Sequence, residues 1–327
     1  MNRLLKTLGL AAGLSLLAAG GTRAEDWTGY TYLASDSSIG AKNLIELGEE
    51  FSEATGGEVD VSINLAGSLG IKAADITQAV GQGIVEIAAD GFFLGAIEEG
   101  GILRLPMMFS SIEDFNKGLD VVTPYLEEAF AEKNVVLLGQ YVYPLQVSFA
   151  TFDMTSLEDM DGKRMRVSSP EQGEFVAAFG GAPFTIGGAE VPAALQTGVV
   201  DGVFTASVGG GNLWKDQLKS TYRMGPNFFN SAIIVNKDAF EALSPEHQKL
   251  LRELGAKYAK KATEEQAASE AEITAQLQAG GMKVFEPKPG DVEKAVELMT
   301  PYWDKWGETK SDRTQKALAE TRAALGL

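Results

Sequence analysis

Residues 244–281 read SPEHQKLLRELGAKYAKKATEEQAASEAEITAQLQAGG and predict one long helix. The stretch opens with a serine N-cap, a proline at the first helical position and a glutamate that the helix dipole favours. No breaker follows before Gly280, although Gly255 weakens the helix by about 1 kcal/mol relative to alanine. A helix of about 35 residues reaches roughly 50 Å, more than the diameter of one domain. We therefore expect it to bridge two lobes, with two helices broken near Gly255 as the alternative.

Short apolar runs alternate with helical patterns through the rest of the chain. Val59, Val61 and Ile63 alternate with polar residues, as in a strand with one buried face. Ser111–Asp114 resembles a capping box and is expected to open a helix to about Lys133. Further short strands are expected at 84–88, 135–138, 165–167, 199–204 and 232–235, and further helices near 289–305 and 311–325. Strands and helices in turn favour an α/β protein with largely parallel sheets.

The first 24 residues have the pattern of a secretory signal peptide. Arg3 and Lys6 form a short basic start, Leu8–Ala19 is an apolar run, and Thr22–Ala24 places small side chains at the two positions that signal peptidase tests. The apolar run is too short to span a bilayer, which takes roughly 20 residues. No cysteine follows it that could carry a lipid anchor, and no other stretch is long and apolar enough to cross a membrane. We expect cleavage near Ala24 and a soluble mature protein that works outside the cytoplasm.

The chain is acidic and contains no cysteine. Its 327 residues carry 28 Lys and Arg against 45 Asp and Glu; the net charge of −17 becomes −20 without residues 1–24, which hold three basic and no acidic side chains. Such a surface repels nucleic acid, so no nucleic-acid partner is expected, while a local pocket can still attract an anion. Without disulfides, stability has to come from a large hydrophobic core. A mature chain of about 300 residues favours two lobes over one.

Side chains that support catalysis are scarce. The one histidine, His247, lies in the first turn of a charged helix, where a solvated surface role is the simplest interpretation. Ser68 lies in a stretch that faintly resembles a nucleophile elbow, but the first glycine of that motif and a plausible base are missing. Zinc would need Cys or His clusters, and no Gly-rich segment has phosphate-loop or dinucleotide spacing. The sequence therefore argues against an enzyme and predicts no cofactor, with a carboxylate-only calcium site left open.

Two blocks of the chain are more specific. Residues 157–167 read LEDMDGKRMRV, a turn that feeds a short strand carrying Arg166, and residues 189–202 read AEVPAALQTGVVDG. Together with TGGEVDVSINLAGSLG at 55–70, LPMMF at 105–109 and VNK at 235–237, they resemble the periplasmic solute-binding proteins of tripartite ATP-independent periplasmic (TRAP) transporters, the DctP-like family. The resemblance covers nearly all of the chain after residue 24, in order.

The resemblance implies two α/β lobes with a ligand cleft between them and a long helix that spans both. Lobe I is expected to hold residues 25–143 and about 231–270, and lobe II residues 144–230 and about 271–327. A ligand that touches both lobes would select the closed form, which is then offered to the membrane permease subunits. The family implies a periplasmic protein that performs no chemistry. We expect a monomer, since nothing in residues 289–325 demands a dimer.

Arg166 matches the family arginine that holds the ligand carboxylate. A guanidinium is a planar, permanently charged fork that fits a carboxylate with two hydrogen bonds. From the residues alone, the competing interpretation is an internal ion pair with an Asp or Glu. Gln146 stands where family members of the sialic-acid type often carry a second arginine, and Thr205 where the family has an asparagine. One cation fewer argues against a dicarboxylate or a heavily charged sugar acid, while both side chains can hydrogen-bond a neutral carbonyl or hydroxyl.

Aromatic and polar side chains near these segments complete the candidate site. Phe92 and Phe93 follow an expected strand, and Trp214 follows three consecutive glycines. Aromatic rings there would cover an apolar ligand body, unless they are core residues. Glu171 follows the strand of the arginine and is either a helix-start acid or a partner for a ligand amine. Ser68, in the family-like opening segment, is a further candidate ligand-binding residue.

These residues predict a small organic acid with one carboxylate and a modest apolar or aromatic body, such as a hydroxy acid, keto acid or amino acid. Three other functions stay open. A binding protein of an ATP-driven importer shares the two lobes but lacks the Gly162–Arg166 block and the bridging helix. A secreted enzyme is disfavoured by the missing catalytic groups. A ligand-sensing module that signals to a membrane receptor would use the same pocket.

Overall fold

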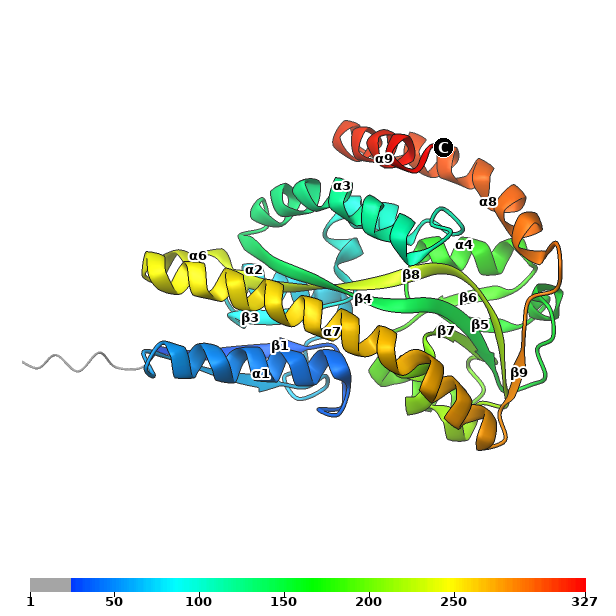
Figure 1. Cartoon of the computed structure of the whole chain (residues 1–327), viewed down its shortest axis with the longest axis horizontal. Helices are drawn as coiled ribbons and strands as arrows, with labels where there is room; N and C mark the ends of the chain where they lie inside the picture. The colour runs from blue at the N-terminus through cyan, green and yellow to red at the C-terminus, as the bar shows by residue number, and fades with distance from the viewer. Residues whose placement is uncertain (1–24) are drawn as a thin grey trace, which may run out of the picture.

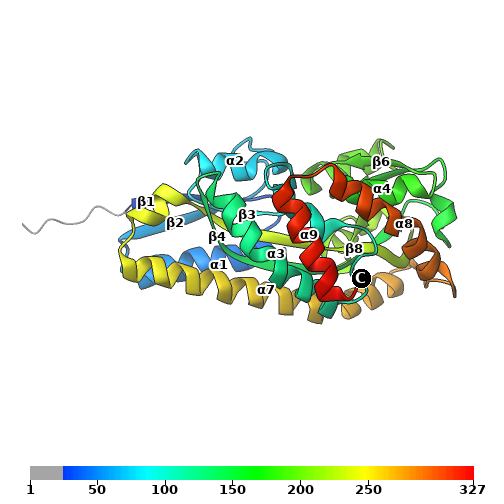
Figure 2. The same ribbon diagram turned by 90° about the horizontal axis from the view of Figure 1, so that it is seen from above.

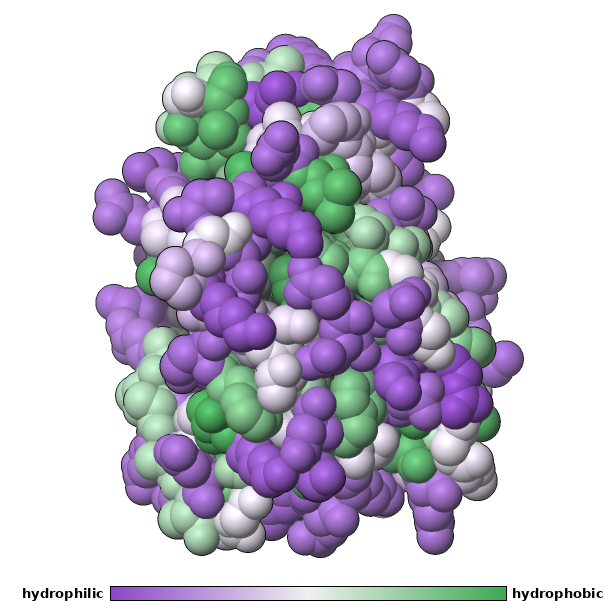
Figure 3. All heavy atoms as spheres, turned by 90° about the vertical axis from the view of Figure 1, so that its right-hand side faces the viewer, coloured by the Kyte–Doolittle hydropathy of each residue, from purple (hydrophilic) through white to green (hydrophobic). Residues whose placement is uncertain are grey.

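The computed structural model describes residues 25–327, and the expected signal peptide, residues 1–24, lies outside the described residues. None of the described helices is both long and apolar enough to cross a membrane. The described residues form four buried hydrophobic clusters, two towards each end of the molecule. At the end that carries α8 and β9, the surface is mainly hydrophilic and its apolar side chains form small separate patches (Figure 3).

Strands and helices alternate through most of the described chain. The strands are β1 (Glu25–Thr31), β2 (Val59–Asn64), β3 (Ile87–Asp90), β4 (Val135–Ala150), β5 (Arg164–Val167), β6 (Ala182–Thr185), β7 (Gly202–Thr205), β8 (Ser220–Asn236) and β9 (Lys283–Phe285). The helices are α1 (Ile39–Ala54), α2 (Ile76–Gly81), α3 (Ile112–Ala131), α4 (Pro170–Ala178), α5 (Val191–Gln196), α6 (Lys237–Ala242), α7 (Pro245–Ala279), α8 (Asp291–Glu308) and α9 (Asp312–Leu325). Each strand and helix predicted from the sequence overlaps one of these elements.

Two long strands, β4 and β8, form the middle of the sheet and run along the molecule (Figure 1). The strand order is β2-β1-β3-β8-β4-β7-β5-β6, with β9 beside β8. β3 pairs with the last part of β8, at Ala232–Val235, and β7 pairs with the last part of β4, at Val147–Ala150. The two outer groups of strands therefore attach to opposite ends of one β4–β8 ribbon, which gives the fold two lobes.

The sheet is mixed, which differs from the prediction of largely parallel sheets. The outer pairs are parallel: β1 with β2 and β3, and β5 with β6 and β7. β4 and β8 are antiparallel because one carries the chain from the first lobe to the second and the other carries it back. Their pairing is irregular on both sides of Gln146, and such interruptions bend a strand and increase its twist.

The long helix α7 is continuous from Pro245 to Ala279, as predicted, and lies along β4 (Figure 1). The Ser244 side chain caps it by accepting a hydrogen bond from the backbone N–H of His247 at 3.2 Å. Gly255 does not break the helix. A Cβ atom at Gly255 would lie 2.6 Å from Cβ of Leu138 on β4, so this glycine allows the helix to approach the strand closely.

The last two helices contact both lobes. α8 buries Met299 in a cluster with α4 and β5, and one turn later buries Trp303 in the cluster that lies under α3. The Trp303 indole N–H donates to the backbone carbonyl of Pro106 at 2.8 Å. α9 then packs along α3, as the view from above shows (Figure 2). The expected division assigned residues 271–327 to lobe II, whereas α9 lies against a helix of the stretch assigned to lobe I.

Candidate functional site

A cavity of about 380 Å³ lies between the two ends of the sheet. Its wall is built from the end of β1 and the start of α1, the middle of β4, strands β5 and β7, the glycine-rich segment Ser207–Gly211 and helix α7. Five of the eight ligand-binding residues predicted from the sequence lie in this wall: Phe92, Gln146, Arg166, Thr205 and Trp214. Because they come from distant parts of the chain, the fold brings them together at one place.

Arg166, on β5, is the central charged group of the cavity. Its side chain is 5% exposed, with Nε donating to the carbonyl of Ile186 at 3.0 Å and Nη1 to the carbonyl of Phe204 at 3.2 Å. Within residues 25–327 it forms no ion pair with an Asp or Glu, in contrast to the competing interpretation of the sequence. Burial lowers the pKa of Arg166 to about 10, so the guanidinium is still charged at neutral pH. A buried cation whose hydrogen bonds within the described residues go only to carbonyl groups favours an anion in the cavity.

Two neutral polar side chains share the cavity wall with the arginine. Gln146 is 4% exposed, and its Nε2 donates to the carbonyl of Pro144 at 2.8 Å, while its Oε1 makes no hydrogen bond to the described residues. The Thr205 hydroxyl accepts from the backbone N–H of Gly210 at 3.0 Å and keeps its own proton to donate. Both groups are neutral, so they can hydrogen-bond a ligand without adding charge to the cavity.

Aromatic rings form much of the cavity wall. On one side, Phe92 packs edge-on against Tyr32 and Phe229, with ring centroids 5.7 and 6.1 Å apart. On the other, Trp214 lies with its ring centroid 5.7 Å from the guanidinium carbon of Arg166. Gly210 makes room for Trp214, because a Cβ atom at position 210 would overlap the indole ring. The site therefore combines one cation with apolar surfaces that can cover the body of a small ligand.

A second buried guanidinium lies behind this wall. Arg104 is fully buried, stands 4.2 Å from the ring centroid of Phe229 and donates to the backbone carbonyl of Asn230 at 2.6 Å. Burial lowers the pKa of Arg104 to about 9, and the charge of Glu171 opposes this shift. Arg104 and Arg166 therefore make the local electrostatic potential near the cavity more positive than the net charge of −17 would suggest.

Three predicted site residues lie outside the cavity wall. Phe93 is 1% exposed and packs on Phe130 in the core, with ring centroids 5.6 Å apart. Glu171 is buried at the start of α4 and accepts a hydrogen bond from the indole N–H of Trp306 at 3.2 Å. Ser68 is exposed in a turn, where its hydroxyl donates to the carbonyl of Leu65.

Other wall residues were not predicted. Tyr32 and Tyr143 line the cavity and share a hydrogen bond between their hydroxyl groups at 2.9 Å. Burial is the main cause that holds the pKa of both phenols well above the ordinary value, so both stay protonated. Tyr32 directly follows β1. Side chains at the end of a strand commonly reach a cleft, so this position could have indicated that Tyr32 lines the cavity. Gln266 on α7 carried no such signal, since it stands among the polar residues of a long charged helix.

The family model described as "Bacterial extracellular solute-binding protein, family 7", DctP, matches residues 30–310. Among curated proteins, the ectoine-binding periplasmic protein TeaA of Halomonas elongata is 28% identical over 211 residues, which is 59% of this chain and 59% of that protein. The ectoine/5-hydroxyectoine-binding periplasmic protein UehA of Ruegeria pomeroyi is 26% identical over 305 residues, 89% of this chain and 84% of that protein.

Solved structures share the fold. DctP7 of Bordetella pertussis, an extracytoplasmic solute receptor binding pyroglutamic acid, superposes with a TM-score of 0.85 at 24% identity, covering 91% of this chain and 100% of that one. A TRAP periplasmic solute-binding protein of Sulfitobacter sp. with bound β-D-galacturonate gives a TM-score of 0.82 at 22% identity, covering 91% and 100%. Because the family model spans most of its length, this chain belongs to family 7 of the bacterial extracellular solute-binding proteins, the DctP solute-binding family of TRAP transporters.

Proposed function

We propose that this protein captures a small organic acid in the cavity between its lobes and delivers it to the membrane subunits of a TRAP transporter. The observation that carries the proposal is Arg166, a buried cation in the cavity wall that forms no ion pair within the described residues. A ligand carboxylate would supply the missing negative charge and would accept hydrogen bonds from a preformed guanidinium. Relatives in the family are solute receptors, which supports binding without chemical conversion.

The ligand is a monocarboxylate with a modest apolar or aromatic body. Gln146 and Thr205 are neutral, so Arg166 is the one cationic side chain in the described wall, which suits a single carboxylate. The aromatic rings of Phe92 and Trp214 suit an apolar ligand body, and a volume of about 380 Å³ suits a small molecule. Pyroglutamic acid and galacturonate, which two structural neighbours bind, are both monocarboxylates.

The same proposal covers export and the division into lobes. The pattern of residues 1–24 supports cleavage near Ala24 and delivery to the periplasm, where the family works. The irregular pairing around Gln146, in the middle of the β4–β8 ribbon, supports a hinge close to the expected boundaries at residues 143–144 and 230–231. The protein acts as a monomer, and its closed form is what the permease recognises.

A thermal-shift screen tests the proposal. The purified mature chain is heated with a panel of monocarboxylates, dicarboxylates and matched neutral amides or esters. A ligand that binds only the folded state raises the melting temperature, by an amount that grows with its concentration. We expect shifts from monocarboxylates and none from their neutral analogues. Shifts from neutral compounds alone would overturn the ligand class.

A further inference from the structure

Gln266, on the long helix α7, is buried beside the cavity without a hydrogen-bond partner. Its side chain is 1% exposed and lines the cavity together with Ile273 on the same helix and Ile39 at the start of α1. Neither its Oε1 nor its Nε2 has a partner in the part of the chain that the structure describes. Leaving a buried amide unpaired costs roughly 1–3 kcal/mol, so an arrangement like this one needs a reason.

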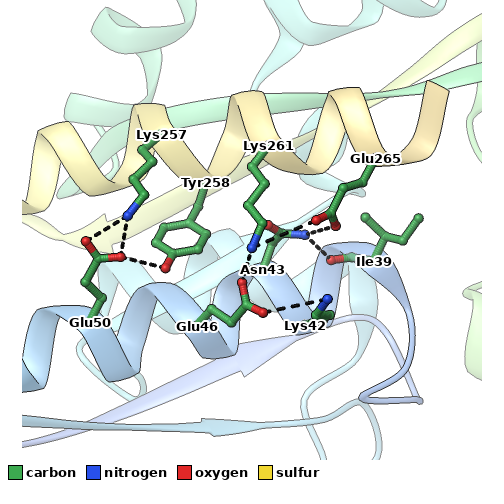
Figure 4. Close-up of polar contacts among 9 residues, drawn as sticks. All are labelled: Ile39, Lys42, Asn43, Glu46, Glu50, Lys257, Tyr258, Lys261 and Glu265. Carbon is green, nitrogen blue, oxygen red and sulfur yellow. Dashed lines mark hydrogen bonds and ion pairs between the residues drawn. The ribbon is translucent and has the colours of Figure 1, made fainter. Parts of the chain in front are cut away.

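Other polar residues of α7 near Gln266 form hydrogen bonds or ion pairs with α1, so the lack of a partner is particular to position 266 among them. Glu265 accepts a hydrogen bond from Asn43 of α1 at 2.9 Å, and Lys261 forms an ion pair with Glu46 (Figure 4). Lys257 pairs in the same way with Glu50, one turn earlier on α7 (Figure 4). α7 thus uses its polar side chains to hold α1, and Gln266, the next residue after Glu265, does not take part.

The chemistry of the unpaired group points to what it recognises. A primary amide offers one acceptor oxygen and two N–H donors and carries no charge. A carboxylate is acceptor-only and would satisfy the nitrogen but leave Oε1 unpaired. An amide or lactam, which has a carbonyl oxygen and an N–H side by side, would satisfy both atoms at once. The hydroxyl groups of Tyr32 and Tyr143, also in the wall, are already hydrogen-bonded to each other.

We propose that Gln266 is a specificity-determining residue, which selects carboxylate ligands that carry an amide or lactam group. The inference rests on the proposed function, since Arg166 holds the carboxylate of the same ligand. Arg166 comes from β5 and Gln266 from α7, so the ligand is held at two points of the wall by two different elements. The long helix α7 would then contribute to ligand selectivity as well as connect the lobes.

The test compares three probes on four proteins by titration calorimetry. Pyroglutamate and N-acetylglycine carry a carboxylate and an amide-type group, and cyclopentanecarboxylate carries the carboxylate alone. The proteins are the wild type, Gln266→Met, Gln276→Met and Arg166→Ala. Methionine keeps the length of glutamine without hydrogen bonding. Gln276 is the matched control because it lies exposed on the same helix and donates to Glu272.

We expect the wild type to bind at least one amide-bearing probe more tightly than cyclopentanecarboxylate. Gln266→Met should weaken binding of that probe about tenfold or more, with cyclopentanecarboxylate changed less than about twofold, and Gln276→Met should change neither. The inference is overturned if Gln266→Met binds the amide-bearing probes like the wild type, if the wild type makes no distinction between the probes, or if it binds neither amide-bearing probe at millimolar concentration. Failure of the proposed function is a separate outcome, because Arg166→Ala would then bind all three probes unchanged.

Discussion

Arg164 and Arg166 lie two residues apart on the same short strand, yet only Arg164 pairs with a carboxylate among the described residues. The Arg164 side chain is 46% exposed and holds Asp201 at 2.8 Å, whereas Arg166 is buried at the cavity and donates to two backbone carbonyls. An exposed ion pair of this kind contributes little to stability and leaves no charge free for a ligand. The difference between the two arginines therefore distinguishes a structural ion pair, at Arg164, from the proposed ligand contact, at Arg166.

Substituting Gly210 with alanine should weaken ligand binding. The added Cβ atom would overlap the indole ring of Trp214 and force the ring out of the cavity wall. We expect affinity for carboxylates that shift the wild-type melting temperature to fall about tenfold, since aromatic contacts are worth several tenths to more than 1 kcal/mol. Calorimetry measures the effect, with Gly95→Ala as control because a Cβ atom there meets nothing within 4 Å. Unchanged affinity in Gly210→Ala would mean that Trp214 does not cover the ligand.

Asp90 should make stability depend on pH. Its carboxylate is fully buried and accepts from the hydroxyl of Thr77 at 2.6 Å and from the N–H of Phe92 at 2.7 Å. Burial raises the pKa of Asp90 from 3.8 to about 6. Because this folded-state pKa lies above the unfolded one, the native state binds the proton more tightly. The contribution of Asp90 to stability is then highest below about pH 4 and is lost as the pH rises through 6.

The variant Asp90→Asn removes this titration. Relative to the variant, the wild type should lose about 2 kcal/mol of unfolding free energy between pH 4 and pH 7, at about 1.4 kcal/mol for each pKa unit and with the unfolded-state carboxyl already partly ionised at pH 4. Urea unfolding at both pH values measures the difference. The exposed substitution Asp60→Asn should change stability by less than about 0.5 kcal/mol at either pH. Parallel pH profiles for the wild type and Asp90→Asn would contradict the assignment.

Gly255→Ala should destabilise the protein although alanine is the better helix former. In an exposed helix the change would stabilise by about 1 kcal/mol. Here the new Cβ atom would lie 2.6 Å from Cβ of Leu138 and 2.9 Å from its carbonyl oxygen, which pushes α7 away from β4. Crowding of this kind costs roughly 1–3 kcal/mol, so the melting temperature should fall. The exposed neighbour Glu253→Ala serves as control, and a rise in stability for Gly255→Ala would show that the helix does not need this close approach.

The sequence predicts most of the elements because local signals mark them. Ser244 and Pro245 mark the start of α7, and the capping pattern at Ser111 marks the start of α3. The length of β4 and β8 was not predictable, since Gly139 and Pro144 interrupt one apolar pattern and Gly225 and Pro226 the other. Long-range pairing between the two strands overrides these local breaks.

Some residues of the candidate site could also be predicted from the sequence, and others could not. The place of Arg166 in the cavity wall could be predicted because its sequence block resembles a known family. Phe92 could be predicted because it follows an expected strand, and Trp214 because it follows three consecutive glycines. Adjacent positions could not be told apart: Phe92 lines the cavity while Phe93 points into the core. Sequence also cannot say that Gln266 lies unpaired, since that depends on which face of α7 meets the cavity.

The most direct test of the account is the affinity of Arg166→Ala and Arg164→Ala for a monocarboxylate that binds the wild type, measured by titration calorimetry. Removing Arg166 takes away a charge-assisted hydrogen-bonded pair in a buried site, which should weaken binding at least about tenfold. Removing Arg164, two residues away and paired with Asp201, should leave affinity within about twofold. Binding by Arg166→Ala that equals the wild type, in a variant with an unchanged melting temperature, would contradict the account.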